Sequence, residues 1–307
     1  SCICSPPPYS TSRRACARER RRTLLIKNDA AGVQAWSLAC RAAGLRIGFV
    51  PTMGALHGGH AALLRAARAE CDRVIASVFV NPLQFGPGED FAAYPRPFER
   101  DKALCAEAGV DLLYHGNPED FYPPGFRTEV RVRELGETLC GRARPGHFEG
   151  VCTVVAKLLL RTFPHRAYFG QKDYQQAAII RRMAADLDIP AAIAVLPTVR
   201  EPDGLAMSSR NAYLGPAERA AAPCIFRGLS AALARFAAGE RGAGALVGTC
   251  RSVIAAEPAA AIEYVAAADA ESLREYAVEE RIGGRAVLAA AVRFGPARLI
   301  DNVLLEP

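Results

Sequence analysis

Two histidines three residues apart are the first groups in this sequence that could carry out chemistry. His57 and His60 lie in the segment PTMGALHGGH, which covers residues 51–60. At this spacing both imidazoles share one face of a helical turn, where they can donate hydrogen bonds to a triphosphate and stabilise charge on a departing pyrophosphate. A metal site is the alternative, but no third His, Cys or Glu stands at a familiar ligand spacing. The pair therefore indicates a phosphate site.

The glycines around this pair favour the same interpretation. Gly58 and Gly59 let the backbone approach a ligand closely, and they lie between an expected strand at 46–50 and an expected helix at 59–70. The first turn of a helix offers free N–H groups and the positive end of the helix dipole to an anion. Open α/β sheets bind their ligands at this kind of strand-to-helix turn.

Three further loops carry polar side chains. Lys172 and Asp173, in FGQKDYQQ, follow another expected strand; the lysine can place a positive charge on phosphate, and the aspartate could cap the next helix or contact a ribose or amine. The segment MSSRN at 207–211 puts two hydroxyls and a guanidinium in one loop, either as an oxyanion clamp or as an ordinary surface turn. Gln84 can hydrogen-bond a small polar substrate through its amide, although most loop glutamines bind nothing.

The elements that must position these loops alternate between short apolar runs and segments of helical spacing. This alternation predicts βαβ units and a doubly wound parallel sheet, an α/β fold. The expected helices cover residues 30–43, 59–70, 97–108, 150–162 and 174–187, and the expected strands cover 46–50, 74–80, 111–114, 166–169 and 192–196.

After about residue 197 the pattern changes. An Ala-rich helical stretch at 216–241 is followed by three expected antiparallel strands at 262–265, 285–293 and 298–305. The sequence therefore predicts a nucleotide- and substrate-binding domain at 23–197 and a smaller α+β domain, acting as a lid, at 198–307.

Charge and cysteine usage limit the other classes of function. The net charge is +6, but residues 1–22 hold six arginines and one acid, so the rest of the chain is nearly neutral. A solvated, disordered leader is the ordinary interpretation of that tail, and RNA contact is the alternative. No apolar run reaches the ~18 residues of a membrane span, which argues against a membrane partner. The ten cysteines form no CxxC pair, which favours buried free thiols in a reducing, cytoplasmic compartment.

Taken together, the segments are similar to those of the pantothenate synthetase family, which this sequence resembles from about residue 24 to residue 307. Seven segments follow the family's order and spacing. They are PTMGALHGGH (51–60), NPLQF (81–85), YPR (94–96), RPGHFEGV (144–151), FGQKDYQQ (169–176), DGLAMSSRN (203–211) and ARLIDN (297–302).

The resemblance implies a function and its partners. It implies a Rossmann-like fold and an ATP-dependent ligase that condenses pantoate with β-alanine to pantothenate through a pantoyl adenylate, releasing AMP and pyrophosphate. It also implies Mg²⁺ held chiefly by ATP oxygens, a cytoplasmic homodimer, and no nucleic-acid partner. A nucleotidylyltransferase with the same HxGH site is the enzymatic alternative, and RNA binding by the arginine tail is the non-enzymatic one.

The resemblance also implies roles for single residues. His60 would be the proton donor, Gln84 and Gln176 would bind pantoate with Gln84 also near β-alanine, and Asp101 aligns with an acidic position linked to Mg²⁺. His57, His60, Lys172 and Arg210 would form the catalytic set. The ATP site would consist of Met53, Gly54, Ala55, Leu56, His57, Gly58, Gly59, His60, Gly170, Gln171, Lys172, Asp173, Val199, Met207, Ser208, Ser209 and Arg210.

Three positions depart from the family pattern. Gln171 replaces a glutamate before the Lys-Asp pair, and Leu83 replaces a methionine of similar volume. Cys140 stands where a glutamate is expected, so a carboxylate near the substrate side is lost. This last change bears on β-alanine and Mg²⁺ handling.

Overall fold

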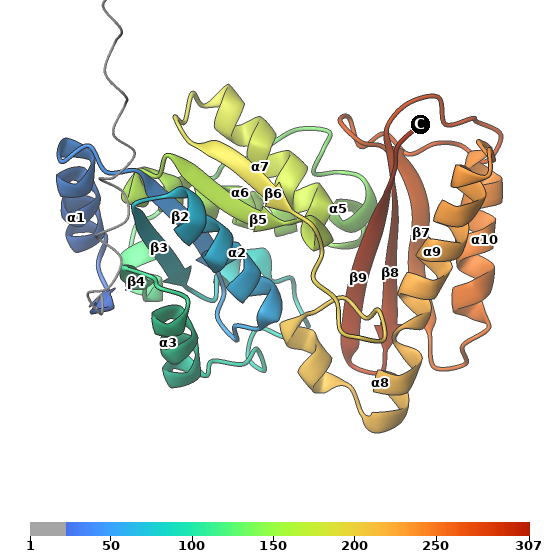
Figure 1. Ribbon diagram of the computed structural model, residues 1–307, viewed down its shortest axis with the longest axis horizontal. Helices are drawn as coiled ribbons and strands as arrows, with labels where there is room; N and C mark the ends of the chain where they lie inside the picture. The colour runs from blue at the N-terminus through green and yellow to red at the C-terminus, as the bar shows by residue number, and fades with distance from the viewer. Residues whose placement is uncertain (1–22) are drawn as a thin grey trace, which may run out of the picture.

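The computed structural model describes residues 23–307, and the expectations for residues 1–22 lie outside the described part. Two sheets organise the described chain (Figure 1). The first has six parallel strands in the order β1-β4-β3-β2-β5-β6, and the second has three antiparallel strands in the order β7-β8-β9. The strands are β1 (Leu25–Lys27), β2 (Ile47–Thr52), β3 (Arg73–Val78), β4 (Leu112–His115), β5 (Arg166–Gly170), β6 (Ala192–Leu196), β7 (Ala261–Asp269), β8 (Ala286–Phe294) and β9 (Ala297–Leu305).

Helices connect and cover these strands. They are α1 (Ala30–Ala42), α2 (Gly58–Glu70), α3 (Phe98–Glu107), α4 (Pro118–Phe121), α5 (Leu139–Ala143), α6 (His147–Thr162), α7 (Tyr174–Asp186), α8 (Pro216–Ala221), α9 (Cys224–Ala237) and α10 (Ala243–Ala255), with the 3-10 turns η1 (Pro82–Gln84), η2 (Gln171–Asp173) and η3 (Ser209–Tyr213).

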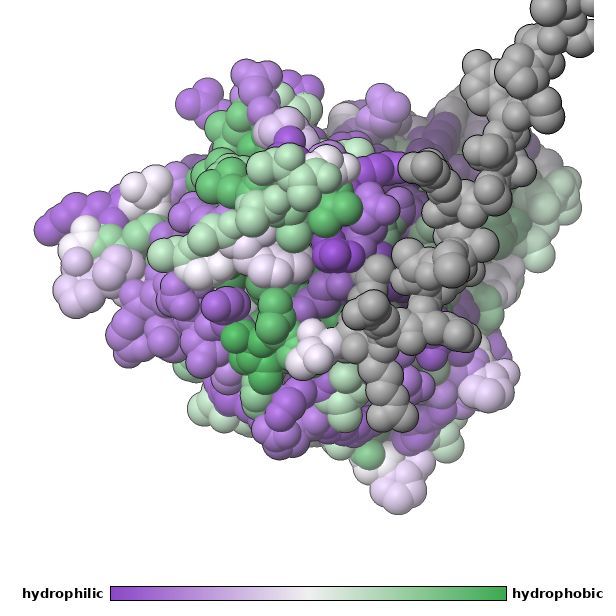
Figure 2. Space-filling model, turned by 60° about the vertical axis from the view of Figure 1, so that its left-hand side comes forward, coloured by the Kyte–Doolittle hydropathy of each residue, from purple (hydrophilic) through white to green (hydrophobic). Residues whose placement is uncertain are grey.

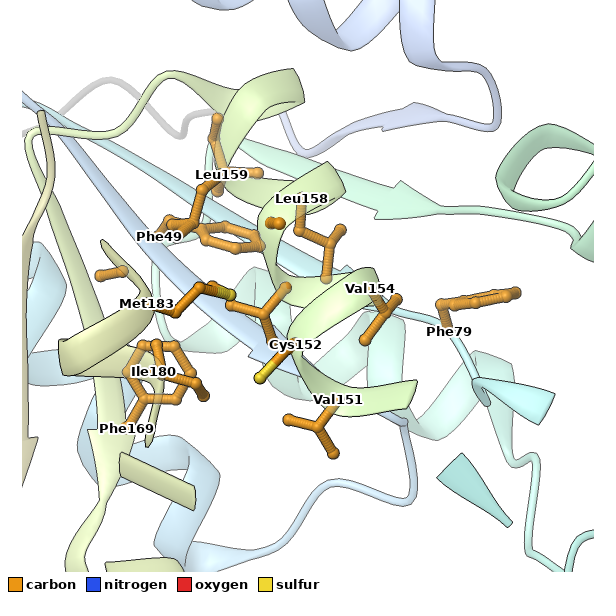
Figure 3. Packing of buried hydrophobic residues seen from close by; sticks show 14 of the residues in the cluster. Phe49, Phe79, Val151, Cys152, Val154, Leu158, Leu159, Phe169, Ile180 and Met183 are labelled. Carbon is orange, nitrogen blue, oxygen red and sulfur yellow. The ribbon is translucent and has the colours of Figure 1, made fainter. Parts of the chain in front are cut away.

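The parallel sheet is buried on both faces because successive side chains of a strand point to opposite sides. In β2, Phe49 packs in the cluster with α1, α6 and α7, whereas its neighbour Val50 packs in the cluster with α2. Ile75 and Ala76 of β3 divide in the same way. Figure 3 shows the first cluster, in which side chains of α6 and α7 close over Phe49. The doubly wound α/β fold predicted from the sequence is confirmed.

The antiparallel sheet has one face covered by helices and one face turned to a cavity. In β8, Leu288 and Ala290 pack in a core with α9 and α10, while Val287 and Ala289 line a cavity toward the parallel sheet. In Figure 1 the three strands lie between α9 and α10 on one side and the first part of the molecule on the other. The smaller α+β domain is thereby present, and the boundary between 197 and 198 stays a prediction.

Most predicted elements agree with the observed ones to within a few residues, and the differences are as follows. The Ala-rich stretch is two helices, α8 and α9, because Pro223 lacks the N–H that a continuous helix would need. α6 begins at His147, three residues before the expected start, and β7 runs on to Asp269. β1, α4, α5 and α10 were not predicted.

The cysteines of the described residues follow the expected pattern. All seven cysteines there are free and buried, as predicted. Among the described helices, none is long and apolar enough to cross a membrane. Hydrophilic side chains cover much of the face drawn in Figure 2, with hydrophobic ones in smaller groups between them.

Candidate active site

The candidate site lies where the two central strands of the parallel sheet end. β2 pairs with β5 through Gly48–Arg166 and Phe49–Ala167, although β3 and β4 come between them in the chain. The helices that follow these strands, α2 after β2 and α7 after β5, therefore cover opposite faces of the sheet. A crevice opens between them at the carboxyl ends of the two strands. The loop that carries His57 and the turn that carries Lys172 meet at this crevice.

The N-terminus of α2 fixes both imidazoles. Nδ1 of His57 accepts from the Gly59 N–H at 3.1 Å, and Nδ1 of His60 accepts from the His57 N–H at 3.3 Å. This is a capping box made by two histidines, whose ring centroids are 4.2 Å apart. Because each Nδ1 accepts, the hydrogen of each neutral ring is assigned to Nε2. Each ring is left with one N–H donor for a ligand.

Burial keeps these rings uncharged near neutral pH. It lowers the pKa of His57 to about 4, with a further contribution from the positive charge of Lys172. Burial, His57 and Lys172 together hold the pKa of His60 well below its usual range. Both imidazoles can therefore act as neutral hydrogen-bond donors rather than as cations.

The loop before these histidines is held by Asp101 of α3. Its carboxylate accepts from the N–H groups of Ala55 at 2.9 Å and of Leu56 at 2.7 Å. Gly54 and Ala55 both have positive φ, +89° and +50°, so this sharp turn needs an external partner for its N–H groups. Asp101 is 1% exposed, and both of its oxygens are engaged. This geometry favours loop positioning over the Mg²⁺ role that the resemblance implied.

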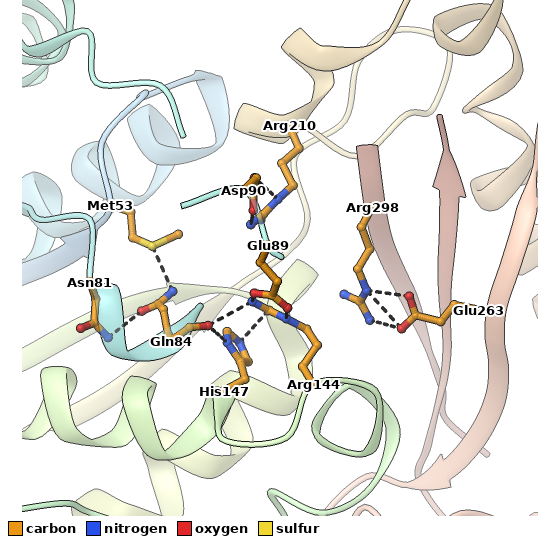
Figure 4. A network of polar contacts seen from close by, with 10 residues as sticks. All are labelled: Met53, Asn81, Gln84, Glu89, Asp90, Arg144, His147, Arg210, Glu263 and Arg298. Carbon is orange, nitrogen blue, oxygen red and sulfur yellow. Dashed lines mark hydrogen bonds and ion pairs between the residues drawn. The ribbon is translucent and has the colours of Figure 1, made fainter. Parts of the chain in front are cut away.

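Gln84 is fixed on both its side chain and its backbone (Figure 4). Its amide accepts from Asn81 Nδ2 at 3.1 Å and contacts Met53 Sδ at 3.0 Å. Its carbonyl accepts from His147 Nδ1 at 2.7 Å and from Arg144 Nη2 at 3.1 Å. Gln84 is therefore a rigid amide at the cavity wall, which is what recognition of a small polar substrate requires.

The loop with the two serines lies against the loop after β3. The Arg210 guanidinium donates from Nε and Nη2 to the two oxygens of Asp90, at 3.0 and 2.9 Å. The Ser209 hydroxyl lies 3.1 Å from the Tyr94 hydroxyl. Next to Asp90, Glu89 accepts from Arg144 Nε at 2.7 Å. Two adjacent carboxylates thus hold two arginines that come from different parts of the chain.

These loops enclose two adjoining cavities. One of about 480 Å³ contains both histidines and Gln84, and one of about 440 Å³ lies between Gln84 and the β7–β9 sheet. Predicted site residues that line at least one cavity are Met53, His57, Gly59, His60, Gln84, Gly170, Lys172, Asp173, Gln176, Val199, Met207, Ser208, Ser209 and Arg210. Those that line neither are Gly54, Ala55, Leu56, Gly58, Asp101 and Gln171.

Sequence reasoning missed several groups at this site. Asn81, Arg144 and His147 were noted only as parts of the NPLQF and RPGHFEGV segments, and no role was predicted for them. Those segments were the signal that could have found them. Glu89 and Asp90 lie in a Pro/Gly-rich loop, where nothing in the sequence distinguishes them from solvated acids.

The family model for pantoate–β-alanine ligase matches residues 25–304. This chain belongs to the pantoate–β-alanine ligase family. It is therefore an enzyme of the ligase class.

Known proteins are similar to this chain over most of its length. The pantothenate synthetase of Roseiflexus sp. (strain RS-1) is 56% identical over 259 residues, which cover 84% of this chain and 92% of the relative. That of Moorella thermoacetica is 53% identical over 276 residues, 90% of this chain and 96% of the relative. The resemblance inferred from the seven segments is confirmed.

Solved structures agree with this assignment. The pantothenate synthetase of Thermus thermophilus has a TM-score of 0.84 at 46% identity, with 92% of this chain and 100% of that chain covered. The ligase of Francisella tularensis, solved in complex with β-γ ATP and β-alanine, has a TM-score of 0.74 at 34% identity, with 92% and 98% covered.

Cys140 is the departure from the family pattern that reaches the cavity. It is buried and lines the 440 Å³ cavity, as does Arg298. Arg298 is held by Glu263 of β7 through bonds of 2.9 Å from Nε and Nη2 (Figure 4). This guanidinium therefore has a carboxylate partner although position 140 supplies none.

Proposed function

We propose that this chain condenses pantoate with β-alanine through an enzyme-bound pantoyl adenylate, releasing AMP and pyrophosphate. The observation that carries the proposal is the convergence of His57, His60, Lys172 and Arg210 with the amide of Gln84 on two joined cavities. Four phosphate-binding groups next to a rigid amide suit a reaction between a triphosphate and a small hydroxy acid. The Francisella tularensis complex with β-γ ATP and β-alanine supports the choice of ligands.

In the first step, a carboxylate oxygen of pantoate attacks the α-phosphorus of ATP, and the bond to the pyrophosphate oxygen breaks. Carboxylate and polyphosphate repel each other, so positive charge and N–H donors must lower the barrier. Lys172 and Arg210 would supply the charge. His57 and His60 would supply Nε2–H bonds, since burial keeps both rings neutral.

In the second step, the neutral amine of β-alanine attacks the carbonyl carbon of the mixed anhydride and AMP leaves with the bonding electrons. The amine loses a proton as the amide forms. Water would destroy the adenylate, so the contact that closes the loop at Ser209 against Tyr94 would protect it.

Substrate positions follow from the same cavities. Gln84 and Gln176 line both of them and would bind pantoate, with Gln84 also next to the incoming amine. Gly170, Asp173 and Val199 line the 480 Å³ cavity and would contact the nucleotide.

Magnesium, assembly and compartment belong to the proposal as well. Among the described residues, no group of three or more His, Cys, Asp or Glu could hold a metal ion. Mg²⁺ with ATP would therefore be held chiefly by phosphate oxygens, which is its usual mode of binding, and would neutralise phosphate charge there.

We also propose a cytoplasmic homodimer; light scattering of the purified protein tests the dimer.

The deciding experiment measures products with each substrate left out in turn. We expect pyrophosphate with ATP and pantoate, and free AMP in stoichiometric amount only when β-alanine is also added. A nucleotidylyltransferase would instead keep the nucleotide in its product, and that result would refute the proposal. RNA binding that is lost with residues 1–22, in a protein that forms no AMP, would favour the non-enzymatic alternative.

A further inference from the structure

The segment ARLIDN has no chemical role in the reaction described above, yet it contains two of the described chain's buried polar side chains. Asp301 and Asn302 of β9 are 4% and 3% exposed. A buried polar group is costly unless it is hydrogen-bonded, so its partners show what it stabilises. Both sets of partners lead to groups at the candidate site.

Asn302 holds the backbone of the lysine turn. Its Nδ2 donates to the carbonyl of Gln171 at 2.9 Å and to the carbonyl of Lys172 at 3.0 Å. Its Oδ1 accepts from Gln171 Nε2 at 3.4 Å. The turn η2 is only three residues long and has no side-chain cap at its start. A strand near the end of the chain therefore fixes the peptide groups on both sides of the Lys172 Cα.

Asp301 holds the hairpin of residues 200–206, which directly precedes the loop with the two serines. Its oxygens accept from Nη1 and Nη2 of Arg200 at 2.5 and 3.0 Å. Arg200 in turn donates to the Gly204 carbonyl at 3.1 Å, and its guanidinium lies 3.7 Å from the centroid of the Phe226 ring. Arg200 also forms a β-bridge with Ala206.

The hairpin ends directly at the loop with the two serines, residues 207–210. The N–H of Met207 donates to the Val199 carbonyl at 3.0 Å, so the segment from Met207 to Arg210 leaves the hairpin with a fixed direction. Asp301 and Asn302 thus hold two separate segments, one with Lys172 and one with Arg210. They are joined to each other by the bond from the Asn302 N–H to Asp301 Oδ1 at 2.8 Å.

We propose that Asp301 and Asn302 are positioning residues that set the relative placement of Lys172 and Arg210 around the triphosphate. This inference rests on the proposed function, because it assigns a role to two residues that act through the groups that bind phosphate. In the first step of the reaction, correct placement of charge is most of what the protein contributes, and a displacement of about 1 Å can cost on the order of 100-fold in rate.

A double-mutant cycle tests the arm through Asn302. Asn302→Ala should lower the rate of pyrophosphate release from ATP and pantoate by about 10- to 100-fold. In a Lys172→Ala background the same change should have less than about a 2-fold effect, since the lysine it places is gone. Asn302→Ser keeps one hydroxyl donor, and its rate of pyrophosphate release should lie between those of the parent and Asn302→Ala.

The arm through Asp301 is tested in the same way. Asp301→Asn should slow pyrophosphate release in the parent and have little further effect in an Arg210→Ala background. Arg285→Ala is the matched control: it removes an exposed ion pair with Glu306 near the same sheet and should leave the rate unchanged. Equal losses with and without Lys172 or Arg210 would overturn the proposal for that arm.

A second measurement does not depend on activity. Amide hydrogen exchange at residues 171–174 should be faster in Asn302→Ala and Asn302→Ser than in the parent, with unchanged cooperative thermal unfolding. Unchanged exchange there overturns the positioning role. If exchange is faster in the two variants but the parent releases no pyrophosphate, the placement of the lysine turn stands and the proposed function is refuted instead.

Discussion

The carboxylate of Asp90 holds the guanidinium of Arg210 through two hydrogen bonds, at 3.0 and 2.9 Å. Arginine presents the same planar pair of donors to a phosphate. A carboxylate therefore occupies the donors that the proposed reaction assigns to ATP. Under that proposal phosphate and Asp90 would compete for Arg210, and the side chains of the pair are only about a quarter exposed, at 24% and 25%.

Asp90→Asn should therefore tighten ATP binding, because it removes the competing charge and keeps the size of the side chain. Partly exposed ion pairs contribute up to about 1 kcal/mol, which corresponds to a decrease in Kd of at most about 5-fold. Calorimetric titration with ATP measures it. Asp90→Asn combined with Arg210→Ala should bind like Arg210→Ala alone. Weaker binding by Asp90→Asn would show that the pair organises the loop instead.

His60→Ala and Lys172→Ala should each slow pyrophosphate release at least ~100-fold, the scale for losing a positioned acid or oxyanion donor. The assay is release from ATP and pantoate without β-alanine. Lys157→Ala is the control, since Lys157 lines neither cavity and lies over the Phe126 ring at 4.7 Å. Unchanged release in either site variant would refute its role.

Asp101→Asn should destabilise the turn before α2 without altering the demand for Mg²⁺. The amide keeps one acceptor oxygen but brings an NH₂ group to the other backbone N–H, which costs about 1–3 kcal/mol. We expect a lower Tm, slower pyrophosphate release, and an unchanged Mg²⁺ concentration for half-maximal rate. A large increase in that Mg²⁺ concentration would restore the metal-binding role that the resemblance implied.

Stability should fall as the pH decreases from about 6.5 to about 4. Burial, together with the charge of Arg144, lowers the pKa of His147 to about 4, whereas an unfolded histidine titrates near 6.5. Between pH 6.5 and pH 4 the unfolded chain binds more protons than the folded one. The contribution of His147 to stability is therefore complete above this pH window and is lost as the pH falls through it. Each such group contributes a slope of at most about 1.4 kcal/mol per pH unit.

His147→Gln isolates that contribution. Urea unfolding of parent and variant across the window should give a smaller pH slope for the variant. Glu89 contributes only below about pH 4.5, because an unfolded glutamate binds protons there whereas the bonds to Arg144 hold the folded pKa at about 2; the slopes are therefore compared above about pH 5. Parallel slopes would contradict the assignment of a neutral His147.

The sequence was sufficient for the features that depend on periodicity and order. The strand that buries Phe49 and Val50 on opposite faces was visible as a short apolar run between helical segments. Two strand-end motifs predicted that His57 and Lys172 would meet, since parallel strands end at one edge. Both line the same cavity.

Other features depended on tertiary contacts that no local pattern encodes. The pairing of Asp90 with Arg210 joins two loops, and either residue alone has the pattern of a solvated charge. α10 was missed because Gly244 and Gly248 lower its helix propensity. The structure gives a reason for a glycine at position 244, because a Cβ there would lie 2.6 Å from the Val278 carbonyl oxygen.

The place of β9 in the chain has a consequence for synthesis. The parallel sheet is complete at Leu196, but the strand that supports Lys172 spans Ala297–Leu305. A nascent chain can therefore fold its first sheet on the ribosome and still lack a fixed lysine turn until β9 emerges. Catalytic competence would then arrive only after β9 has been made, so that chains stalled before Ala297 would bind nucleotide poorly and turn over little ATP.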